Sequence, residues 1–239
     1  MARNVVVTGG GTGIGFEIAR RFAEAGERVV IVGRRRAVLE KAAADLGARV
    51  TPLVCDLADP DAVEHALLGL PAEIDVLVNN AGSRETVHGA GPHAMVARWR
   101  GDFERNVLTV VLLTESIRDR LTQGSGRVIT VSSIAALRGA GSYGAAKASL
   151  HAWNHFLAAQ LGPSGITANI VAPGTVAGTE FFGPRLDEAE VARRAARTLL
   201  GRIGETGEVA AAVHFLASAE AGFITGEILH LNGGELLGR

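Results

Sequence analysis

The sequence predicts a doubly wound α/β fold (a Rossmann fold), in which helices cover both faces of a seven-stranded parallel sheet within a single domain of 239 residues. Short runs rich in β-branched residues alternate with longer amphipathic stretches, which is typical of parallel strands joined by helical crossovers. The first six strand candidates are nearly continuous apolar runs, as expected for strands that are covered on both faces. Ligands of such folds bind beyond the carboxyl ends of the strands.

The strands are expected where apolar, β-branched residues are concentrated, and they are, in chain order, Val5–Thr8, Val29–Val32, Val50–Val54, Asp75–Asn79, Val128–Val131, Thr167–Ala172 and Ile228–Leu231. Helices are expected where apolar residues recur at helical spacing. In chain order these are Gly15–Ala25, Arg36–Asp45, Pro60–Leu70, roughly Arg98–Leu121, Ser142–Leu161 and Gly207–Ala217. Asp59 before Pro60 is a helix-start signal, and Asp187 with Glu190 has the spacing of a capping box for another helix over about Asp187–Leu200.

Composition excludes several classes of partner. The formal net charge is −1, so no global basic field is available for nucleic acid or an anionic membrane surface. No apolar run approaches the roughly 18–20 residues of a membrane span. Cys55 is the only cysteine and cannot form an internal disulfide, and the chain runs from Met1 into an apolar strand without a signal peptide. We therefore expect a cytoplasmic protein.

A glycine-rich turn follows the first strand. It comprises Thr8–Gly15 and leads into a helix with apolar Ile14, Ile18 and Phe22. Glycines let the backbone pass close to a pyrophosphate, whose charge is then stabilised by the positive end of the helix. A flexible turn without a ligand is the alternative, but its place after the first strand of a βαβ pattern favours a dinucleotide site.

The end of the second strand indicates which dinucleotide binds. An NAD site usually has Asp or Glu there to hold the ribose hydroxyls, whereas this chain has Gly33 followed by Arg34, Arg35 and Arg36. A guanidinium group suits a 2′-phosphate because it forms planar, charge-assisted hydrogen bonds. We expect Arg34 to favour NADP(H) over NAD(H), and Arg35 and Arg36 to open a solvated helix.

The strongest catalytic signal is the pair Tyr143 and Lys147, and Tyr143 is the only tyrosine in the chain. Residues four apart share one face of a helix, so the ammonium would lie close to the phenol and lower its pKa toward the working pH of a general acid. A half-buried helix face with a solvated lysine is the alternative.

Motifs over nearly the full length resemble the short-chain dehydrogenase/reductase family, and several segments resemble 3-oxoacyl-carrier-protein reductases. The resemblance implies catalytic roles for Tyr143, Lys147, Asn106 and Ser133, the second serine of the pair that ends the fifth strand. The cofactor-binding residues that it implies are Gly9, Gly11, Thr12, Gly13, Ile14, Gly15, Arg34, Asp56, Leu57, Asn80, Ala81, Gly82, Tyr143, Lys147, Pro173, Gly174, Val176 and Thr179.

This chain departs from the family pattern at three places. The loop Ile134–Ser142 is about three residues shorter than is usual in the family, and the loop Pro173–Thr179 is one residue longer. Thr12 stands where many NADP-dependent members have a basic residue. These departures affect the assignments of Ser133 and Thr179.

Elementary chemistry gives the catalytic residues roles. Hydride transfer to a ketone builds negative charge on its oxygen, which needs a hydrogen-bond donor and a proton source. Ser133 is expected to hold the oxygen, Tyr143 to protonate it, Lys147 to tune Tyr143 and bind the ribose, and Asn106 to connect the lysine to solvent. The chain is thus predicted to interconvert a ketone and a secondary alcohol with NADP(H). The alternatives are an NAD-linked alcohol dehydrogenase and a non-catalytic cofactor-binding regulator, which would be expected to lose Tyr143 or Lys147.

The remaining expectations concern surfaces. Apolar residues on the two long helices exceed what one sheet face needs, so a homotetramer or homodimer is expected. A lid over about Thr179–Leu200 is expected from Phe181 and Phe182 before a Gly-Pro break. Arginines in that lid offer a contact for an acyl carrier protein; they are Arg193, Arg194 and Arg197.

Four aromatic and histidine positions are expected to be structural. His151 and His155 have the spacing of two metal ligands on a helix, but no third ligand is positioned beside them, so no metal is expected. Trp99 and Trp153 are expected to be packing anchors.

Overall fold

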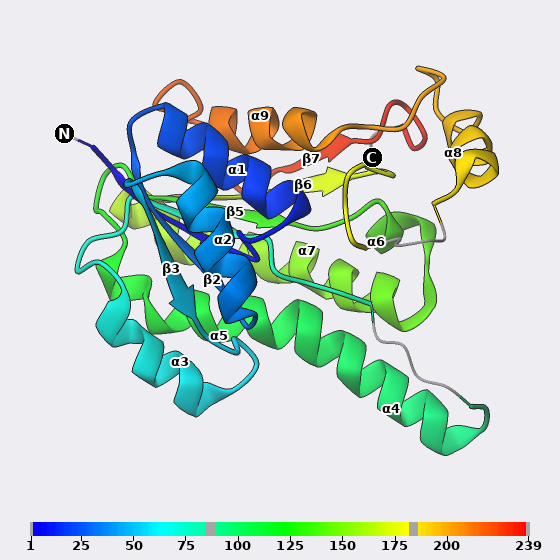
Figure 1. Ribbon diagram of the computed structural model, residues 1–239, viewed down its shortest axis with the longest axis horizontal. Helices are drawn as coiled ribbons and strands as arrows, with labels where there is room; N and C mark the ends of the chain where they lie inside the picture. The colour runs from blue at the N-terminus through cyan, green and yellow to red at the C-terminus, as the bar shows by residue number, and fades with distance from the viewer. Residues whose placement is uncertain (1, 85–88, 182–185, 238–239) are drawn as a thin grey trace.

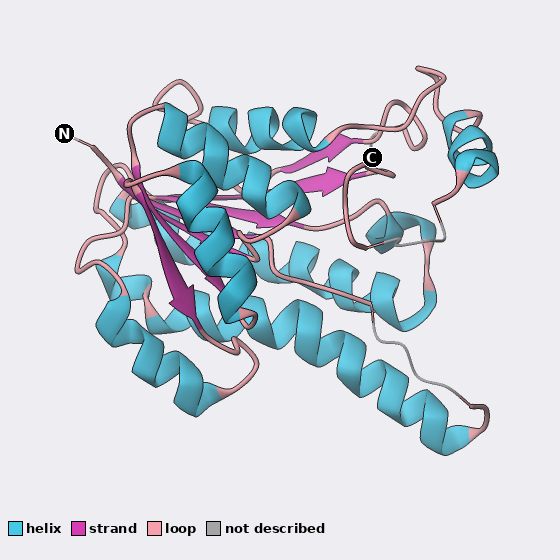
Figure 2. Cartoon of the chain, viewed as in Figure 1, coloured by secondary structure: helices cyan, strands magenta, loops and turns pink. Residues whose placement is uncertain are grey.

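The computed structural model describes residues 2–84, 89–181 and 186–237. A seven-stranded parallel sheet in the order β3-β2-β1-β4-β5-β6-β7 forms its centre, with helices on both faces (Figures 1 and 2). The strands are β1 (Asn4–Thr8), β2 (Arg28–Gly33), β3 (Val50–Val54), β4 (Val76–Asn79), β5 (Arg127–Val131), β6 (Thr167–Pro173) and β7 (Ile228–Leu231). The predicted fold class is confirmed, and each strand end lies within one residue of its expected position.

Alternating side chains of the strands build two hydrophobic cores, one on each face of the sheet. Val5 and Val7 of β1 pack in the first core, and Val6 packs in the second. The helices that cover the first core are α1 (Gly13–Glu24), α2 (Arg36–Leu46) and α9 (Thr206–Leu216). Those that cover the second are α3 (Pro60–Ala66), α5 (Thr109–Ser116) and α7 (Gly141–Leu161). Because strand side chains alternate between faces, one apolar run supplies both cores.

The order of the strands reverses at β1, which pairs with β2 on one side and with β4 on the other. The segments after β1 and β4 therefore leave the sheet side by side, at the place where such folds bind ligands. Thr8 ties the two segments together, because its Oγ1 accepts hydrogen bonds from the backbone N–H groups of Asn80 and Ala81, both at 2.9 Å.

The single helix expected over Arg98–Leu121 is wrong. The chain forms α4 (Pro92–Phe103), a π-helical turn (Glu104–Leu108) and α5 (Thr109–Ser116). The first turns of α4 are exposed and carry no core-facing stripe, so periodicity could not show that the helix begins at Pro92. The π-turn spans Asn106, and π-turns are frequent at functional sites.

Two smaller elements also differ from expectation. The shortened loop before α7 contains a short helix, α6 (Ala135–Arg138), that no sequence signal marked. The helix expected over Asp187–Leu200 is α8 (Glu188–Ala195). Asp187 caps it as expected, because its Oδ1 accepts from the backbone N–H of Glu190 at 2.8 Å. The Glu190 side chain does not complete a capping box but pairs with Arg193 and Arg194. Within the described ranges, no helix combines the length and apolarity that crossing a membrane requires.

Candidate active site

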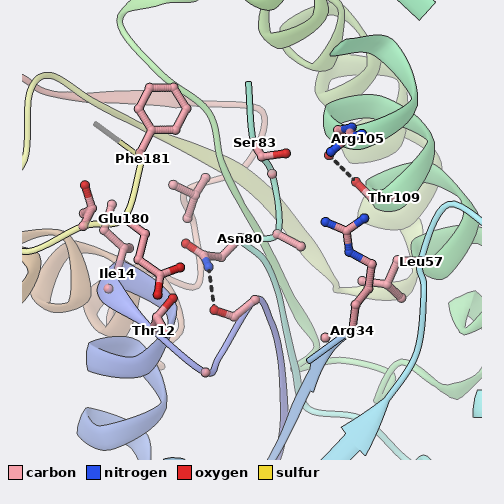
Figure 3. A pocket seen from close by; sticks show the side chains of 18 of the residues that line it. Thr12, Ile14, Arg34, Leu57, Asn80, Ser83, Arg105, Thr109, Glu180 and Phe181 are labelled. Carbon is pink, nitrogen blue, oxygen red and sulfur yellow. Dashed lines mark hydrogen bonds between the residues drawn. The ribbon is translucent and has the colours of Figure 1, made fainter. Parts of the chain in front are cut away.

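A pocket of about 710 Å³ opens beyond the carboxyl ends of the strands (Figure 3). Segments that follow β1 to β6 all contribute to its wall. The predicted cofactor-binding residues that line it are Gly9, Gly11, Thr12, Gly13, Ile14, Arg34, Asp56, Leu57, Asn80, Ala81, Gly82, Tyr143, Lys147, Pro173, Gly174, Val176 and Thr179. Gly15 is not among them. A Cβ atom on Gly15 would collide with the carbonyl of Gly9, so this glycine lets the start of α1 pack against the turn.

The glycine-rich turn lines the pocket and leads into the N-terminus of α1. Thr12 is the N-cap residue of α1, yet its side chain makes no capping hydrogen bond. The first N–H groups of the helix therefore keep their positive potential toward the pocket, which suits a pyrophosphate. A Cβ atom on Gly13, whose φ is 55°, would lie 3.5 Å from the Cα of Thr179, so the segment after β6 passes directly over this turn.

Beyond the turn, at the end of β2, the pocket is lined by an exposed arginine. Arg34 leaves the end of β2 beside Leu57 and points toward Thr109 (Figure 3). Arg34 makes no hydrogen bond or ion pair with another described residue. Arg35 is more than a solvated helix residue, because its Nη2 lies 2.8 Å from Glu180 Oε2 in the segment after β6. This end can therefore hold a phosphate with Arg34 while Arg35 is paired elsewhere.

Tyr143 and Lys147 lie at the opposite end, in the first two turns of α7. Their exposed fractions are 9% and 4%. Lys147 Nζ donates to the carbonyl of Val131 at 3.1 Å, and burial lowers its pKa to about 8. Burial also raises the pKa of Tyr143 to about 12. The expected lowering of this pKa by Lys147 is not observed, since desolvation of the phenolate is the largest effect.

The two serines after β5 have different surroundings. The hydroxyl of Ser133 faces the Tyr143 phenol, and this hydrogen bond acts to lower the pKa of Tyr143. Ser132 is buried and its Oγ lies 2.9 Å from Nε2 of His151. Burial lowers the pKa of His151 to about 4, so the imidazole is neutral near pH 7. His151 is therefore engaged with Ser132, while His155 is exposed.

Asn106 is fully buried behind the pocket wall. Its Nδ2 donates to the carbonyls of Ser83 at 2.7 Å and Asp102 at 2.8 Å. Its Oδ1 is buried without a hydrogen-bond partner among the described residues. A Cβ atom built on Gly82 would lie 2.7 Å from this oxygen and 3.1 Å from Lys147 Nζ, so both atoms border the same small space.

Comparisons with known proteins agree with this arrangement. A family model described as enoyl-(acyl carrier protein) reductase matches residues 9–235. A 3-oxoacyl-[acyl-carrier-protein] reductase of Escherichia coli is 35% identical over 236 residues, covering 96% of this chain and 95% of the relative. The chain belongs to the short-chain dehydrogenase/reductase family. It is therefore an oxidoreductase that acts on CH–OH or carbonyl groups with NAD(P).

Other members of the family are similar to the same degree. The galactitol 2-dehydrogenase (L-tagatose-forming) of Cereibacter sphaeroides is 35% identical over 238 residues, covering 95% of this chain and 92% of the relative. A crystal structure from Brucella melitensis, described as a short-chain dehydrogenase/reductase of the glucose/ribitol dehydrogenase type, has a TM-score of 0.88 and 31% identity. It covers 99% of this chain and 97% of that one. These relatives differ in their substrates, so the family does not fix the substrate.

Several pocket residues of this short-chain dehydrogenase/reductase carry no sequence motif. Arg84 follows the Asn-Asn-Ala-Gly segment, and Arg105 and Thr109 lie on the helix beside Asn106. Helical spacing from Asn106 is the signal that could have found Thr109, which lies three residues further along. Phe181 also lines the pocket, and its ring lies 5.3 Å from that of Tyr143. Phe182 of the expected lid lies outside the described residues.

Proposed function

We propose that this chain interconverts a ketone and a secondary alcohol with NADP(H), using Ser133, Tyr143, Lys147 and Asn106. The observation that carries the proposal is that these residues meet the predicted cofactor-binding residues around one pocket. Tyr143 and Lys147 lie at one end of a pocket whose other end is a helix N-terminus and an exposed arginine. A dinucleotide has the same arrangement of parts, with a reactive ring at one end and charged phosphates at the other.

The nicotinamide of the cofactor, when bound, supplies or accepts the hydride. Ser133 donates a hydrogen bond to the carbonyl oxygen of the substrate, and Tyr143 gives that oxygen its proton. Lys147 lies on the same face of α7 and is held by the carbonyl of Val131. Asn106 Oδ1 and Lys147 Nζ border one space at Gly82, where a water molecule would connect the lysine to a proton supply.

The preference for NADP(H) is supported by the end of β2. Arg34 lines the pocket there, is exposed, and makes no ion pair with another described residue. No acidic residue occupies the end of β2, where NAD enzymes hold the ribose hydroxyls. A 2′-phosphate beside Arg34 would gain a charge-assisted hydrogen bond, which NAD(H) cannot offer.

The test is to mix the purified protein with NADPH or NADH and a panel of ketones while nicotinamide absorbance is followed. Oxidation of NADPH by at least one ketone, faster than that of NADH, is the expected result. Faster use of NADH would show an NAD-linked dehydrogenase instead. Tight NADPH binding without turnover of any ketone would favour the non-catalytic regulator.

We also propose that the enzyme forms a dimer or tetramer through α4 and α7. Trp153 is partly buried against the core, as expected, but Trp99 is 51% exposed and is not a packing anchor within the chain. Phe103 on α4 and Phe156 on α7 are 45% and 55% exposed. Solvent-exposed aromatic residues on neighbouring helices favour burial against a second copy. A light-scattering mass near the single-chain value of 24.8 kDa at micromolar concentration would contradict this.

An acyl carrier protein has weaker support as a partner. Arg193 and Arg194 of α8 are paired with Glu190. Arg197 is paired with Glu235. Each of the three arginines is thus engaged in an ion pair within the chain, although they share only two carboxylates. Our proposal therefore takes a small ketone as the substrate. Residence in the cytoplasm stays a prediction.

A further inference from the structure

One buried carboxylate beside the active site has no role in the reaction proposed above. Asp102, near the end of α4, is 1% exposed, and its Oδ2 accepts a hydrogen bond from Ser142 Oγ at 2.6 Å. Ser142 is also buried and directly precedes Tyr143 in the first turn of α7. Burial of a carboxylate costs free energy and is rare without a specific interaction. A buried carboxylate therefore lies against the residue that precedes the only tyrosine of the chain.

Asp102 joins two segments of the active site. Its main-chain carbonyl accepts from Nδ2 of Asn106 at 2.8 Å, while its side chain holds Ser142. The π-turn that carries Asn106 and the helix start that carries Tyr143 are therefore linked through one residue. Ala140, the N-cap residue of α7, makes no capping side-chain hydrogen bond, and the carboxylate from α4 lies at this positive helix end. These contacts fix the position of the carboxylate at the start of α7, the helix that carries Tyr143.

The charged groups around Tyr143 come from three described segments. Lys147 lies on α7 itself, Arg84 lies in the segment after β4, and Asp102 lies on α4. Burial is the largest cause of the raised pKa of Tyr143, followed by the opposing hydrogen bond of Ser133, then the raising charge of Asp102 and the lowering charge of Arg84. Asp102 thus opposes Arg84 in its effect on the pKa of the phenol.

We propose that Asp102 is a positioning residue which, held by Ser142, keeps the proton on Tyr143 and extends carbonyl reduction to more alkaline pH. This inference rests on the proposed function. Reduction uses the proton of Tyr143, whereas oxidation needs a phenolate that can accept one, so the same charge moves the range of alcohol oxidation to higher pH as well. The equilibrium between ketone and alcohol is unchanged.

The ionisation of Tyr143 can be measured without cofactor or substrate, because ultraviolet absorbance of tyrosinate reports on the only tyrosine. Asp102→Asn removes the charge but keeps an oxygen that can accept from Ser142. Ser142→Ala removes the hydrogen bond and keeps the charge. The comparison is made at the highest pH at which circular dichroism shows every protein folded. The ratio of tyrosinate to tyrosine should be about threefold to tenfold higher in Asp102→Asn than in the unmutated protein.

In Ser142→Ala this ratio should remain closer to that of the unmutated protein. Asp119→Asn is the control, because Asp119 is exposed, and its ratio should equal that of the unmutated protein. Should Asp102→Asn fail to fold, Asp102→Leu removes the charge with an apolar side chain instead. A ratio that is the same with and without the carboxylate would overturn the inference. A merely structural role would change the stability of both the Asp102 and Ser142 variants and leave the ratio unchanged.

The pH profile of ketone reduction by NADPH provides the functional readout. In Asp102→Asn its alkaline limb should move down by about half to one pH unit. A changed tyrosinate ratio in a protein that reduces no ketone would overturn the proposed function and keep the coupling of Asp102 to Tyr143. Ketone reduction with an unchanged ratio would overturn the coupling and keep the function.

Discussion

The two ends of the pocket are built in different ways. At the Tyr143 end, the phenol, Lys147 and Asn106 are buried and fixed by neighbouring strands and helices. At the Arg34 end, the guanidinium is exposed. Next to it, an exposed ion pair between Arg35 and Glu180 connects the end of β2 to the segment after β6. Buried charged groups interact strongly but lose solvation free energy, whereas the interactions of exposed groups are screened by water and salt. The proposed function thus places the chemistry at the buried end and the choice of cofactor at the exposed end.

Removal of the phenol should give the largest effect and would test whether the buried end performs the chemistry. Tyr143→Phe deletes one hydroxyl, so folding and NADPH binding should persist while turnover falls by about 10²–10⁴. Stopped-flow or steady-state absorbance of NADPH measures the loss, and circular dichroism checks the fold. A Tyr143→Phe protein with near-normal activity would remove the tyrosine from the mechanism.

The contrast between the two ends also explains what sequence alone could predict. Short apolar runs between amphipathic stretches predicted the sheet, and helical spacing predicted that Tyr143 and Lys147 share one face of a helix, because both signals come from local geometry. The pKa of Tyr143 was not predictable, since it depends on burial and on Asp102, which approaches from another helix. Likewise, the pairing of Arg35 with Glu180 joins residues 145 positions apart and leaves no local pattern.

Arg34→Asp should give the next largest effect, at the exposed end. The ratio of NADPH affinity to NADH affinity should fall by about tenfold to a hundredfold, because an attraction for the 2′-phosphate becomes a repulsion. Titrations of both cofactors, monitored by nicotinamide fluorescence, measure this ratio. Arg36→Asp is a matched control, since Arg36 is exposed and does not line the pocket. An unmutated protein that prefers NADH would refute the assignment of Arg34.

The pH dependence of stability should report the desolvation cost at the buried end. The pKa of Lys147 is about 8 in the folded chain and ordinarily 10.5, so the unfolded chain binds more protons between these values and stability should rise with pH there. The pKa of Tyr143 is about 12 against an ordinary 10.0, so stability should fall above pH 10. In the unmutated protein, the free energy of unfolding measured with urea should rise by about 1 to 3 kcal/mol over this pH interval. In Lys147→Met this rise should be absent. A rise that persists in Lys147→Met would assign it to other groups.

The smallest effect is expected from the lid, which lies between the two ends. Phe181 is half-buried, lines the pocket and contacts the ring of Tyr143 at 5.3 Å. An aromatic pair of this kind contributes about 0.5–1.5 kcal/mol, and a lid residue contributes little to the core. Phe181→Ala should therefore raise the KM for hydrophobic ketones by about threefold to tenfold while stability changes by less than about 1 kcal/mol.

Phe223→Ala is the matched control for this variant, because Phe223 is fully exposed and does not line the pocket. It should leave both KM and stability unchanged. The split between kinetics and stability decides the role of Phe181. A loss of several kcal/mol with unchanged KM would place the ring in the core, since a residue that only closes over substrate cannot contribute that much to folding. Thr179, Glu180 and Phe181 would then be a fixed part of the pocket wall, and access to Tyr143 would depend on the Arg34 end alone.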